Sequence, residues 1–157
     1  MGRKLVAYFS ASGVTEKLAK TLADAVGADT FEIRPEQPYT DADLNWQDKN
    51  SRSSIEMRDK SFRPAVADKI ENMADYDTIY VGFPIWWYVA PTIVNTFLEQ
   101  YDLTGKTIVP FATSGGGGMG NTNAELASSC NGAVLKEGKK FSANANKSEL
   151  KAWSENL

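Results

Sequence analysis

A chain of 157 residues can bury one substantial core, so we expect a single domain over residues 1–157. Hydrophobic residues make up 42% and charged residues 24%, which is typical of a globular protein and excludes disordered or collagen-like chains. The net charge of −3, without a stripe of lysine and arginine, argues against nucleic acid or an anionic membrane surface as a partner.

The residue types that are rare or absent exclude further classes. The sequence has no histidine, which removes the usual Ser-His-Asp and Cys-His hydrolases. Cys130 is the only cysteine, so neither an intrachain disulfide nor a multi-cysteine metal site can form, and we expect this residue to be a small buried apolar one. We also expect no metal site, because the acidic residues lack the spacing of a metal-binding loop. With no membrane-length apolar run and no signal-peptide core after Met1, the chain is expected in the cytoplasm.

The first part of the chain predicts a strand, a tight loop, a helix and a second strand. Residues 4–9 form a short apolar run, and residues 10–13 form a polar turn of small side chains. Apolar residues then recur at helical spacing up to a capping position at Gly27. Those residues are Val14, Leu18, Leu22, Ala25 and Val26. Residues 29–33 predict the second strand, with Phe31 and Ile33 on one face.

A long polar segment separates this unit from the next. Residues 36–63 show no clean periodicity, and such a long connection is usually functional or mobile. The spacing of Val66, Ile70 and Met73 predicts a helix, and residues 78–83 predict a strand that is covered on both faces. Another amphipathic helix follows Pro91. Its apolar residues are Ile93, Val94, Phe97, Leu98 and Tyr101.

The last part of the chain continues the alternation. Residues 107–112 predict a strand, and Pro110 predicts a bulge there because proline cannot donate to a ladder. A glycine-rich loop at 114–120 leads into a helix with a capping box at Thr122 and Glu125. A short strand at 133–135 and a helix with Leu150, Trp153 and Leu157 on one stripe complete the chain. Five strands alternating with helices predict an α/β fold, a doubly wound parallel sheet with helices on both faces.

Ligands of such a sheet bind beyond the carboxyl ends of the strands, where three loops are expected to meet. The first loop runs from Ser10 to Thr15 and offers three hydroxyls, a glycine and a helix N-terminus, which favour a phosphate. The alternative is that its Ser and Thr side chains only cap the helix. The second loop, residues 83–88, carries Trp86, Trp87 and Tyr88, of which at least one ring should line a concave surface; core packing and a partner interface are the alternatives.

The third loop, residues 113–120, lets the backbone come close to a ligand because glycine has no Cβ. Gly115, Gly117 and Gly120 also satisfy the dinucleotide pattern G-x-G-x-x-G, with Glu137 after the next strand. Any run of four glycines nearly satisfies that pattern, and simple flexibility is a third interpretation. No P-loop lysine motif is present, which disfavours an ATPase or a kinase.

Taken together, these loops resemble those of the flavodoxin family over nearly the whole chain. Strand 4–9 followed by Ser10-x-Ser12-Gly13-x-Thr15 is similar to the family's phosphate-loop signature, and the second and third loops are similar to its two flavin-flanking loops. The resemblance implies FMN as cofactor and the sheet order 2-1-3-4-5. It also implies the cofactor-binding residues, which are Ser10, Ala11, Ser12, Gly13, Val14 and Thr15 at the phosphate, Pro84, Ile85, Trp86, Trp87 and Tyr88 at one edge of the isoalloxazine, and Thr113, Ser114, Gly115, Gly116 and Gly117 at the other.

The resemblance implies an FMN protein that carries electrons between redox partner proteins, with the chemistry on the flavin and no catalytic side chain. This chain departs from typical carriers, which are more acidic and have a flavin-stacking tyrosine in the last loop. The segment Pro84-x-Trp86-Trp87-x-x-x-Pro91 also looks like the flavin loop of NAD(P)H:quinone reductases. An FMN-dependent NAD(P)H:quinone oxidoreductase with residues 36–63 as a lid, and a binding module without flavin, are therefore the alternatives.

Overall fold

The computed structural model describes residues 3–10, 13–45, 47–59, 61–86, 89–113, 119–120, 122–142 and 144–157. Its strands are β1 (Arg3–Tyr8), β2 (Asp29–Glu32), β3 (Tyr76–Pro84), β4 (Thr107–Thr113), β5 (Val134–Leu135) and β6 (Lys139–Lys140). Its helices are α1 (Val14–Val26), α2 (Arg52–Arg58), α3 (Thr92–Glu99), α4 (Thr122–Ala127) and α5 (Lys147–Glu155), with a 3-10 turn, η1, at Met73–Asp75.

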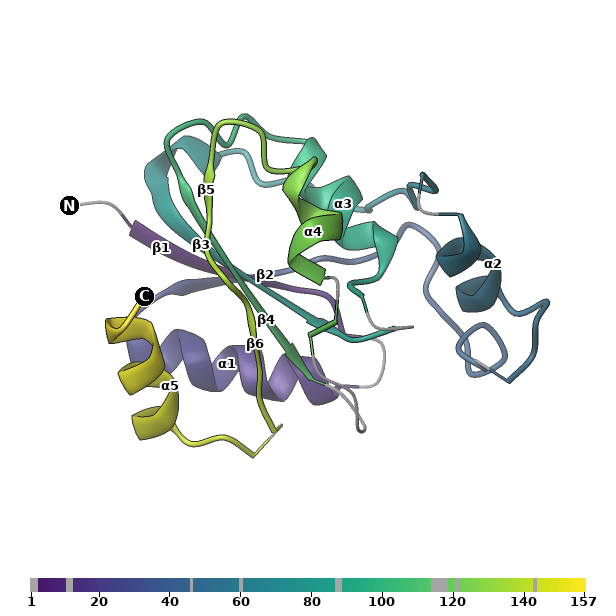
Figure 1. The fold of residues 1–157 in the computed structure, drawn as a ribbon, viewed down its shortest axis with the longest axis horizontal. Coiled ribbons are helices and arrows are strands. Elements are labelled where there is room, and N and C mark those ends of the chain that lie inside the picture. Colours follow the sequence, from purple (N-terminus) through teal and green to yellow (C-terminus); the bar gives the residue numbers. More distant parts are fainter. Residues whose placement is uncertain are drawn as a thin grey trace.

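All strand pairs are parallel and follow the order β2-β1-β3-β4-β5, which confirms the predicted α/β fold. Helices α1 and α5 lie on one face of the sheet, and α3 and α4 lie on the other (Figure 1). Both described termini lie at the end of the sheet opposite the loops that follow the strands (Figure 1). The strands thus direct their carboxyl ends to one edge, beyond which α2 projects.

Alternation along the strands divides the core into two layers. Leu5, Ala7 and Phe9 point toward α3, whereas Val6 and Tyr8 point toward α1 and α5. Along β3 and along β4, successive side chains also alternate between the two layers, as expected for strands that are buried on both faces. The sheet is therefore a rigid support for the loops at its carboxyl edge.

The irregularity predicted at Pro110 of β4 occurs in the neighbouring edge strand, between β5 and β6. Strand β4 pairs with β5 at Ile108↔Leu135 and with β6 at Phe111↔Lys139, so two residues of β4 lie opposite three of the edge strand. A proline at this position offers no N–H to the edge strand. Asn123 of α4 replaces the missing ladder bonds: its Nδ2 donates to the Lys136 carbonyl at 2.8 Å, and its Oδ1 accepts from the Gly138 amide at 3.0 Å.

The helix predicted from Val66, Ile70 and Met73 is wrong. This segment runs extended to η1, and a bridge joins Val66 to Pro35. The Glu36 amide donates to the Ala65 carbonyl, and the Ala67 amide donates to the Arg34 carbonyl, so the backbone pairs with a neighbouring segment. Ile70 and Met73 are nevertheless buried on the α3 side of the sheet, which explains their helix-like spacing.

Four smaller expectations also need correction. Val14 was expected in the core but is 44% exposed, because the buried stripe of α1 begins at Thr15. Leu157 lies beyond the end of α5 and is 40% exposed. Thr122 is the first residue of α4 and its hydroxyl donates to the Met119 carbonyl, so Thr122 is not the N-cap that the capping box requires. Strand β6 was not expected.

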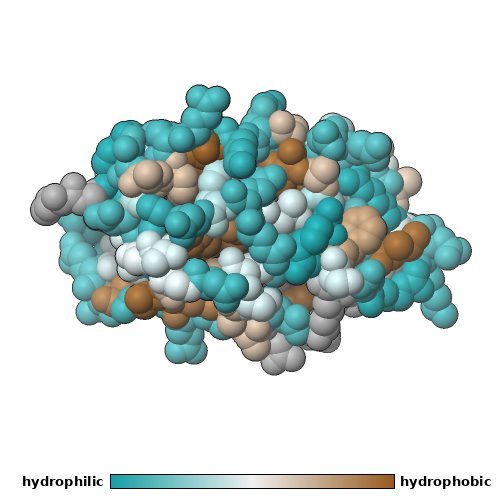
Figure 2. Space-filling model, turned by 90° about the horizontal axis from the view of Figure 1, so that it is seen from above, coloured by the Kyte–Doolittle hydropathy of each residue, from teal (hydrophilic) through white to brown (hydrophobic). Residues whose placement is uncertain are grey.

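The exposed surface is mixed in polarity. On the face seen in Figure 2, hydrophilic residues predominate and the hydrophobic residues lie in separate areas among them. Among the helices in the described ranges, none is long and apolar enough to cross a membrane. Cys130 is buried, as expected from the sequence.

Candidate functional site

Three loops start at the carboxyl edge of the sheet, where their strands end in register. Tyr8 of β1 pairs with Gly82 of β3, and Pro84 of β3 pairs with Thr113 of β4. Two further backbone bonds continue the ladders, from the Phe9 amide to the Gly82 carbonyl and from the Ile85 amide to the Thr113 carbonyl, both at 2.9 Å. The three loops therefore start from positions fixed by the sheet.

The first loop leads into α1 through Gly13, whose φ of 89° favours glycine. Ser10 Oγ accepts hydrogen bonds from the Gly13 amide at 3.0 Å and from the Glu16 amide at 3.2 Å. Ser10 is therefore a helix cap, which is the simpler of the two roles predicted for this loop. The amides of Val14 and Thr15 have no acceptor among the described residues, and they belong to the end of the helix that attracts anions.

A buried hydroxyl pair connects the first loop to the third. Thr15 Oγ1 lies 2.8 Å from Thr113 Oγ1, although the two residues are 98 positions apart in the chain. Thr15 is 1% exposed and Thr113 is 5% exposed. Because each hydroxyl carries one proton and one bond uses only one of them, the pair keeps a second proton that can be donated to a ligand.

The second loop begins as a closed turn. The Trp86 amide donates to the Val89 carbonyl at 2.9 Å, and the Val89 amide donates to the Trp86 carbonyl at 3.1 Å. The Trp86 ring packs against two other aromatic rings, 5.6 Å from Phe9 and 5.5 Å from Tyr39 between centroids. Phe9 and Tyr39 are 5.6 Å apart, and all three contacts are edge-to-face. The Trp86 ring is therefore partly buried and packs against the core with one part of its surface.

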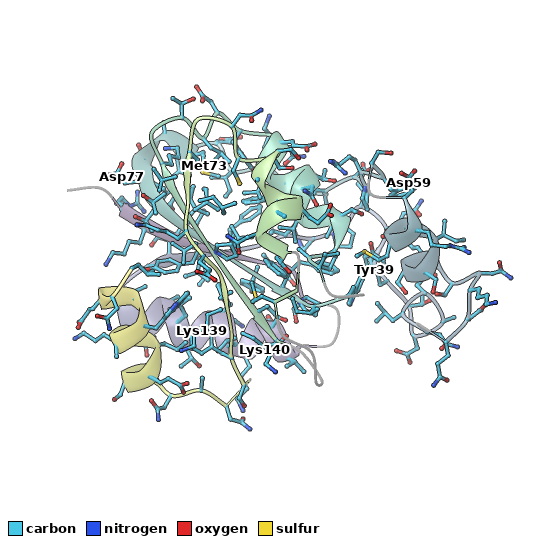
Figure 3. All side chains as sticks on the ribbon, viewed as in Figure 1. Tyr39, Asp59, Met73, Asp77, Lys139 and Lys140 are labelled. Atoms are coloured by element: carbon cyan, nitrogen blue, oxygen red, sulfur yellow. The ribbon has the colours of Figure 1, made fainter. Side chains whose placement is uncertain are left out.

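Tyr39 comes from the long polar segment, and its partners come from helix α2 of the same segment. Its hydroxyl donates to Glu56 Oε1, while Arg52 lies over its ring with the guanidinium carbon 3.8 Å from the centroid. Burial, then the hydrogen bond to Glu56, raises the pKa of Tyr39, so its hydroxyl stays protonated. Figure 3 shows Tyr39 between α2 and the carboxyl edge of the sheet.

Tyr8 is a second tyrosine that stays protonated near this edge. Burial raises its pKa to about 12, and the charge of Glu16 contributes further. Among the described residues there is no group of three or more acidic or cysteine side chains that could hold a metal ion.

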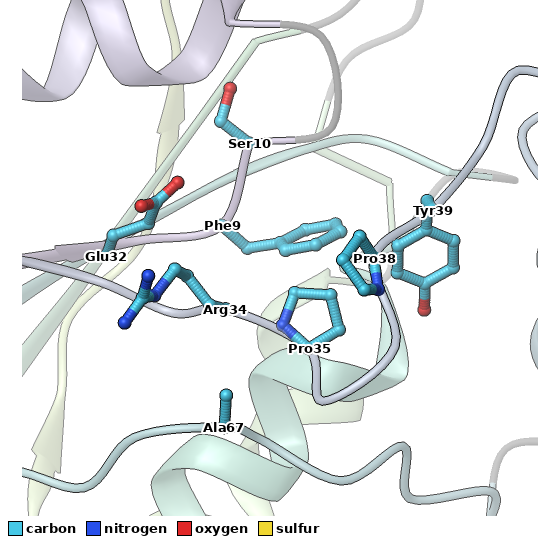
Figure 4. A pocket seen from close by; sticks show the side chains of 8 residues that line it. All are labelled: Phe9, Ser10, Glu32, Arg34, Pro35, Pro38, Tyr39 and Ala67. Atoms are coloured by element: carbon cyan, nitrogen blue, oxygen red, sulfur yellow. The ribbon is translucent and has the colours of Figure 1, made fainter.

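A pocket of about 380 Å³ adjoins the first loop on the side of β2 (Figure 4). Ser10 lies at its wall, and Phe9 and Tyr39 contribute aromatic rings. Its other lining residues are Glu32, Arg34, Pro35, Pro38 and Ala67. Arg34 forms an ion pair with Asp68. The pocket thus combines apolar walls with a few polar groups, as small-molecule sites do.

The structure describes half of the predicted site residues. Ser10, Gly13, Val14, Thr15, Pro84, Ile85, Trp86 and Thr113 lie at the carboxyl edge as predicted. The predicted residues Ala11, Ser12, Trp87, Tyr88, Ser114, Gly115, Gly116 and Gly117 lie outside the described residues. Sequence reasoning missed Tyr39, Arg52 and Glu56, for which the only signal was an aromatic residue in a polar segment too long for a simple connection.

Comparison with known proteins identifies the family. The family described as Flavodoxin matches residues 3–157 of this chain. The chain belongs to the flavodoxin family. No curated protein matches the chain significantly.

Solved structures resemble this flavodoxin-family chain over its whole length. A protein of Bacteroides eggerthii DSM 20697, provisionally assigned as a flavoprotein, is 46% identical with a TM-score of 0.95, covering 100% of this chain and 98% of that one. A protein of Bacteroides uniformis ATCC 8492 with the same provisional assignment is 48% identical with a TM-score of 0.92, covering 98% of each chain. A flavoprotein of Lactobacillus acidophilus NCFM in complex with FMN is 23% identical with a TM-score of 0.73, covering 98% of this chain and 99% of that one.

Proposed function

We propose that this flavodoxin-family protein binds FMN at the carboxyl edge of its sheet and carries electrons between redox partners. The observation that supports FMN most directly is the first loop. It sets two amides without a described acceptor at the N-terminus of a thirteen-residue helix, beside the hydroxyls of Ser10 and Thr15. These are the donors that a phosphate dianion needs, and a phosphate monoester is what distinguishes FMN from riboflavin.

The comparisons add independent support. The L. acidophilus flavoprotein shares the fold and was solved with FMN, and the two Bacteroides proteins are assigned provisionally as flavoproteins. FMN supplies reversible one- and two-electron redox chemistry when it is bound. Because this chemistry belongs to the cofactor, the absence of histidine and of a metal-ligand motif from the sequence does not conflict with a redox function.

In this proposal each of the three loops contacts a different part of FMN. The hydroxyls of Ser10 and Thr15 and the amides of Val14 and Thr15 hold the phosphate. Residues 84–88 flank one edge of the isoalloxazine, and residues 113–117 flank the other. The buried pair of Thr15 and Thr113 ties the phosphate loop to the last of these segments. The protein thereby orients the ring and limits the access of water to it.

A second function is favoured by the pocket beside Ser10. Its volume of about 380 Å³ is within the range of small-molecule sites, and its wall includes Pro38 and Tyr39 of the long polar segment. An NAD(P)H:quinone oxidoreductase needs such a pocket for a small acceptor. We place the carrier first because the sequence contains no convincing nicotinamide-binding motif.

Anaerobic mixing with nicotinamide nucleotides decides between these functions. A reductase must hold the nicotinamide against the flavin, so NADPH or NADH alone should bleach it rapidly and saturably. For a carrier we expect the FMN-loaded protein to stay oxidised with either nucleotide, yet to be reduced by dithionite or by a flavodoxin reductase. Rapid bleaching followed by turnover on addition of a quinone would overturn the carrier proposal and assign the pocket to the acceptor.

A further inference from the structure

The long polar segment forms an ordered arm that reaches the second loop. We call residues 36–59 the arm. Ser51 begins α2 by accepting the Ser54 amide with its hydroxyl, and the Ser54 hydroxyl donates to the Asp48 carbonyl at 2.8 Å. The Ser53 amide donates to the Asp43 carbonyl at 2.9 Å. These bonds fix α2 against the rest of the arm, so the arm has a defined shape.

One buried carboxylate organises the contact between the arm and the sheet. The Glu56 side chain is 4% exposed, and a buried carboxylate is costly unless its oxygens are bonded. Tyr39 donates its hydroxyl to Oε1, and Arg52 donates Nε to Oε2 at 2.8 Å. Arg52 also donates Nη1 to the Gln37 carbonyl at 2.6 Å, two residues before Tyr39.

These contacts leave Tyr39 little freedom. Its hydroxyl is bonded to Glu56, one face of its ring carries the Arg52 guanidinium, and the ring makes edge-to-face contacts with Phe9 and Trp86. A cation over an aromatic ring is worth more where the pair is partly desolvated, and the Arg52 side chain is only 22% exposed. The arm residues Glu56 and Arg52 therefore fix the position of Tyr39, and the Tyr39 ring packs against Trp86.

Because Trp86 belongs to the second loop, its contact with Tyr39 restricts the position of that loop. It closes the turn with Val89 through two backbone hydrogen bonds, and the preceding residue, Ile85, is bonded to Thr113 of β4. A displacement of the Trp86 ring would therefore move the start of the turn. Residues 84–88 are the ones that flank the isoalloxazine in the proposed function.

We propose that Tyr39, held by Glu56 and Arg52, is a positioning residue that sets the second flavin loop through its contact with Trp86. This inference rests on the proposed function, because it assigns to the arm an effect on the bound flavin ring. Tyr39 acts through Trp86 and not by contact with the phosphate. Its influence should therefore be the same on FMN and on riboflavin.

The experiment compares Tyr39→Phe, Glu56→Gln and Arg52→Lys with the unchanged protein. Dissociation constants for FMN and for riboflavin are measured by quenching of flavin fluorescence, and the visible circular dichroism of the bound flavin reports the ring environment. We expect each variant to weaken both ligands by about three- to tenfold and to change the visible dichroism. Tyr101→Phe is the matched control, because its hydroxyl accepts from the Ile70 amide and its ring packs against Phe97.

The outcomes separate this inference from the proposed function. Unchanged affinities and dichroism in the folded variants, with normal FMN binding by the unchanged protein, would overturn the role of Tyr39 and leave the proposed function intact. Equal losses in Tyr101→Phe would show a general effect of stability and would also overturn it. A loss for FMN but not for riboflavin would place the effect at the phosphate, contrary to the inference. Failure of the unchanged protein to bind FMN would instead overturn the proposed function.

Discussion

At the scale of single residues, Thr15 is the side chain on which the phosphate assignment depends most. Ser10 already serves as the cap of α1, so its bonds do not by themselves indicate a ligand. Thr15 differs because its hydroxyl lies in a buried pair with Thr113 that retains one proton to donate.

Replacing Thr15 by alanine should therefore weaken FMN binding while leaving riboflavin binding nearly unchanged. A hydrogen bond to a charged group is worth about 1.5–3 kcal/mol, or roughly ten- to hundredfold in affinity. Titration of the apoprotein with both flavins measures the change. Thr21→Ala is the control, since the Thr21 hydroxyl donates to the Lys17 carbonyl of the same helix. Unchanged FMN affinity in a folded Thr15→Ala protein would mean that Thr15 has only a structural role.

Cys130 should be protected in the native protein. Burial raises the pKa of its thiol to about 11, so little thiolate forms at pH 8. A disulfide reagent at pH 8 should modify it slowly in the native state and at once in denaturant. Because the folded pKa lies above the unfolded value of 9.0, the stability linked to this group is present below pH 9 and is lost as pH rises through about 11. Rapid native modification would contradict the buried placement.

The sequence could predict the residues of the loops but not what each side chain contacts. The signature from Ser10 to Thr15 predicts a phosphate loop from residue types and spacing that are local in the chain. The sequence predicted that at least one ring of Trp86, Trp87 and Tyr88 lines a concave surface, but it could not show that Trp86 packs on Phe9 and Tyr39. Its partners lie in other parts of the chain, and no local pattern identifies such a pairing.

At the scale of elements, the local sequence pattern predicted correctly those helices and strands whose buried side chains follow a single helical or strand period. Helix α1 and strands β3 and β4 occur within two residues of their predicted bounds. The pattern predicted a helix wrongly at Val66, Ile70 and Met73. The backbone of residues 65–67 pairs with residues 34–36, and this segment packs, against the core, side chains that are three or four positions apart, as in a helix. It also missed α2, because that helix is held by polar contacts, including buried serines, and presents no apolar stripe.

The bulge beside Pro110 provides a test at this scale. Asn123→Ala removes both side-chain bonds that replace the ladder with β4 in the segment from β5 to β6, and it leaves the Lys136 carbonyl and the Gly138 amide without these partners. Both groups are half-buried, and each lost hydrogen bond costs about 0.5–1.5 kcal/mol, so we expect the free energy of unfolding to fall by at least about 1 kcal/mol. Urea unfolding measures it. Asn72→Ala, which removes an exposed contact with Asp75 and a side-chain hydrogen bond with Tyr76, should cost less, and equal stabilities of the two variants would contradict the role of Asn123.

At the scale of the whole molecule, the sheet order explains why the candidate site lies where it does. Strand β1 lies between β2 and β3. The chain adds β2 on one side of β1 and then β3, β4 and β5 on the other side, so the strand order changes direction between β1 and β3. Crevices at such switch points are where ligands of open α/β sheets bind. The alternation of strands and helices predicted the doubly wound parallel sheet, and the resemblance to the flavodoxin family implied its strand order.

The arm is the part of the molecule that topology did not predict. It projects from the carboxyl edge of the sheet and brings Tyr39 back to the second loop (Figures 1 and 3). Its residues are polar because they bond to one another around Glu56, so their composition resembles that of an unstructured loop. This arrangement joins the arm to the second loop through Tyr39 and Trp86.

The central claim is that the N-terminus of α1 binds the phosphate of a flavin, and one titration tests it most directly. The apoprotein is titrated with FMN and with riboflavin under the same conditions, and the quenching of flavin fluorescence gives both dissociation constants. Several charge-assisted hydrogen bonds distinguish the two ligands, so FMN should bind more tightly by at least about a hundredfold. Equal affinities for FMN and riboflavin would contradict the claim.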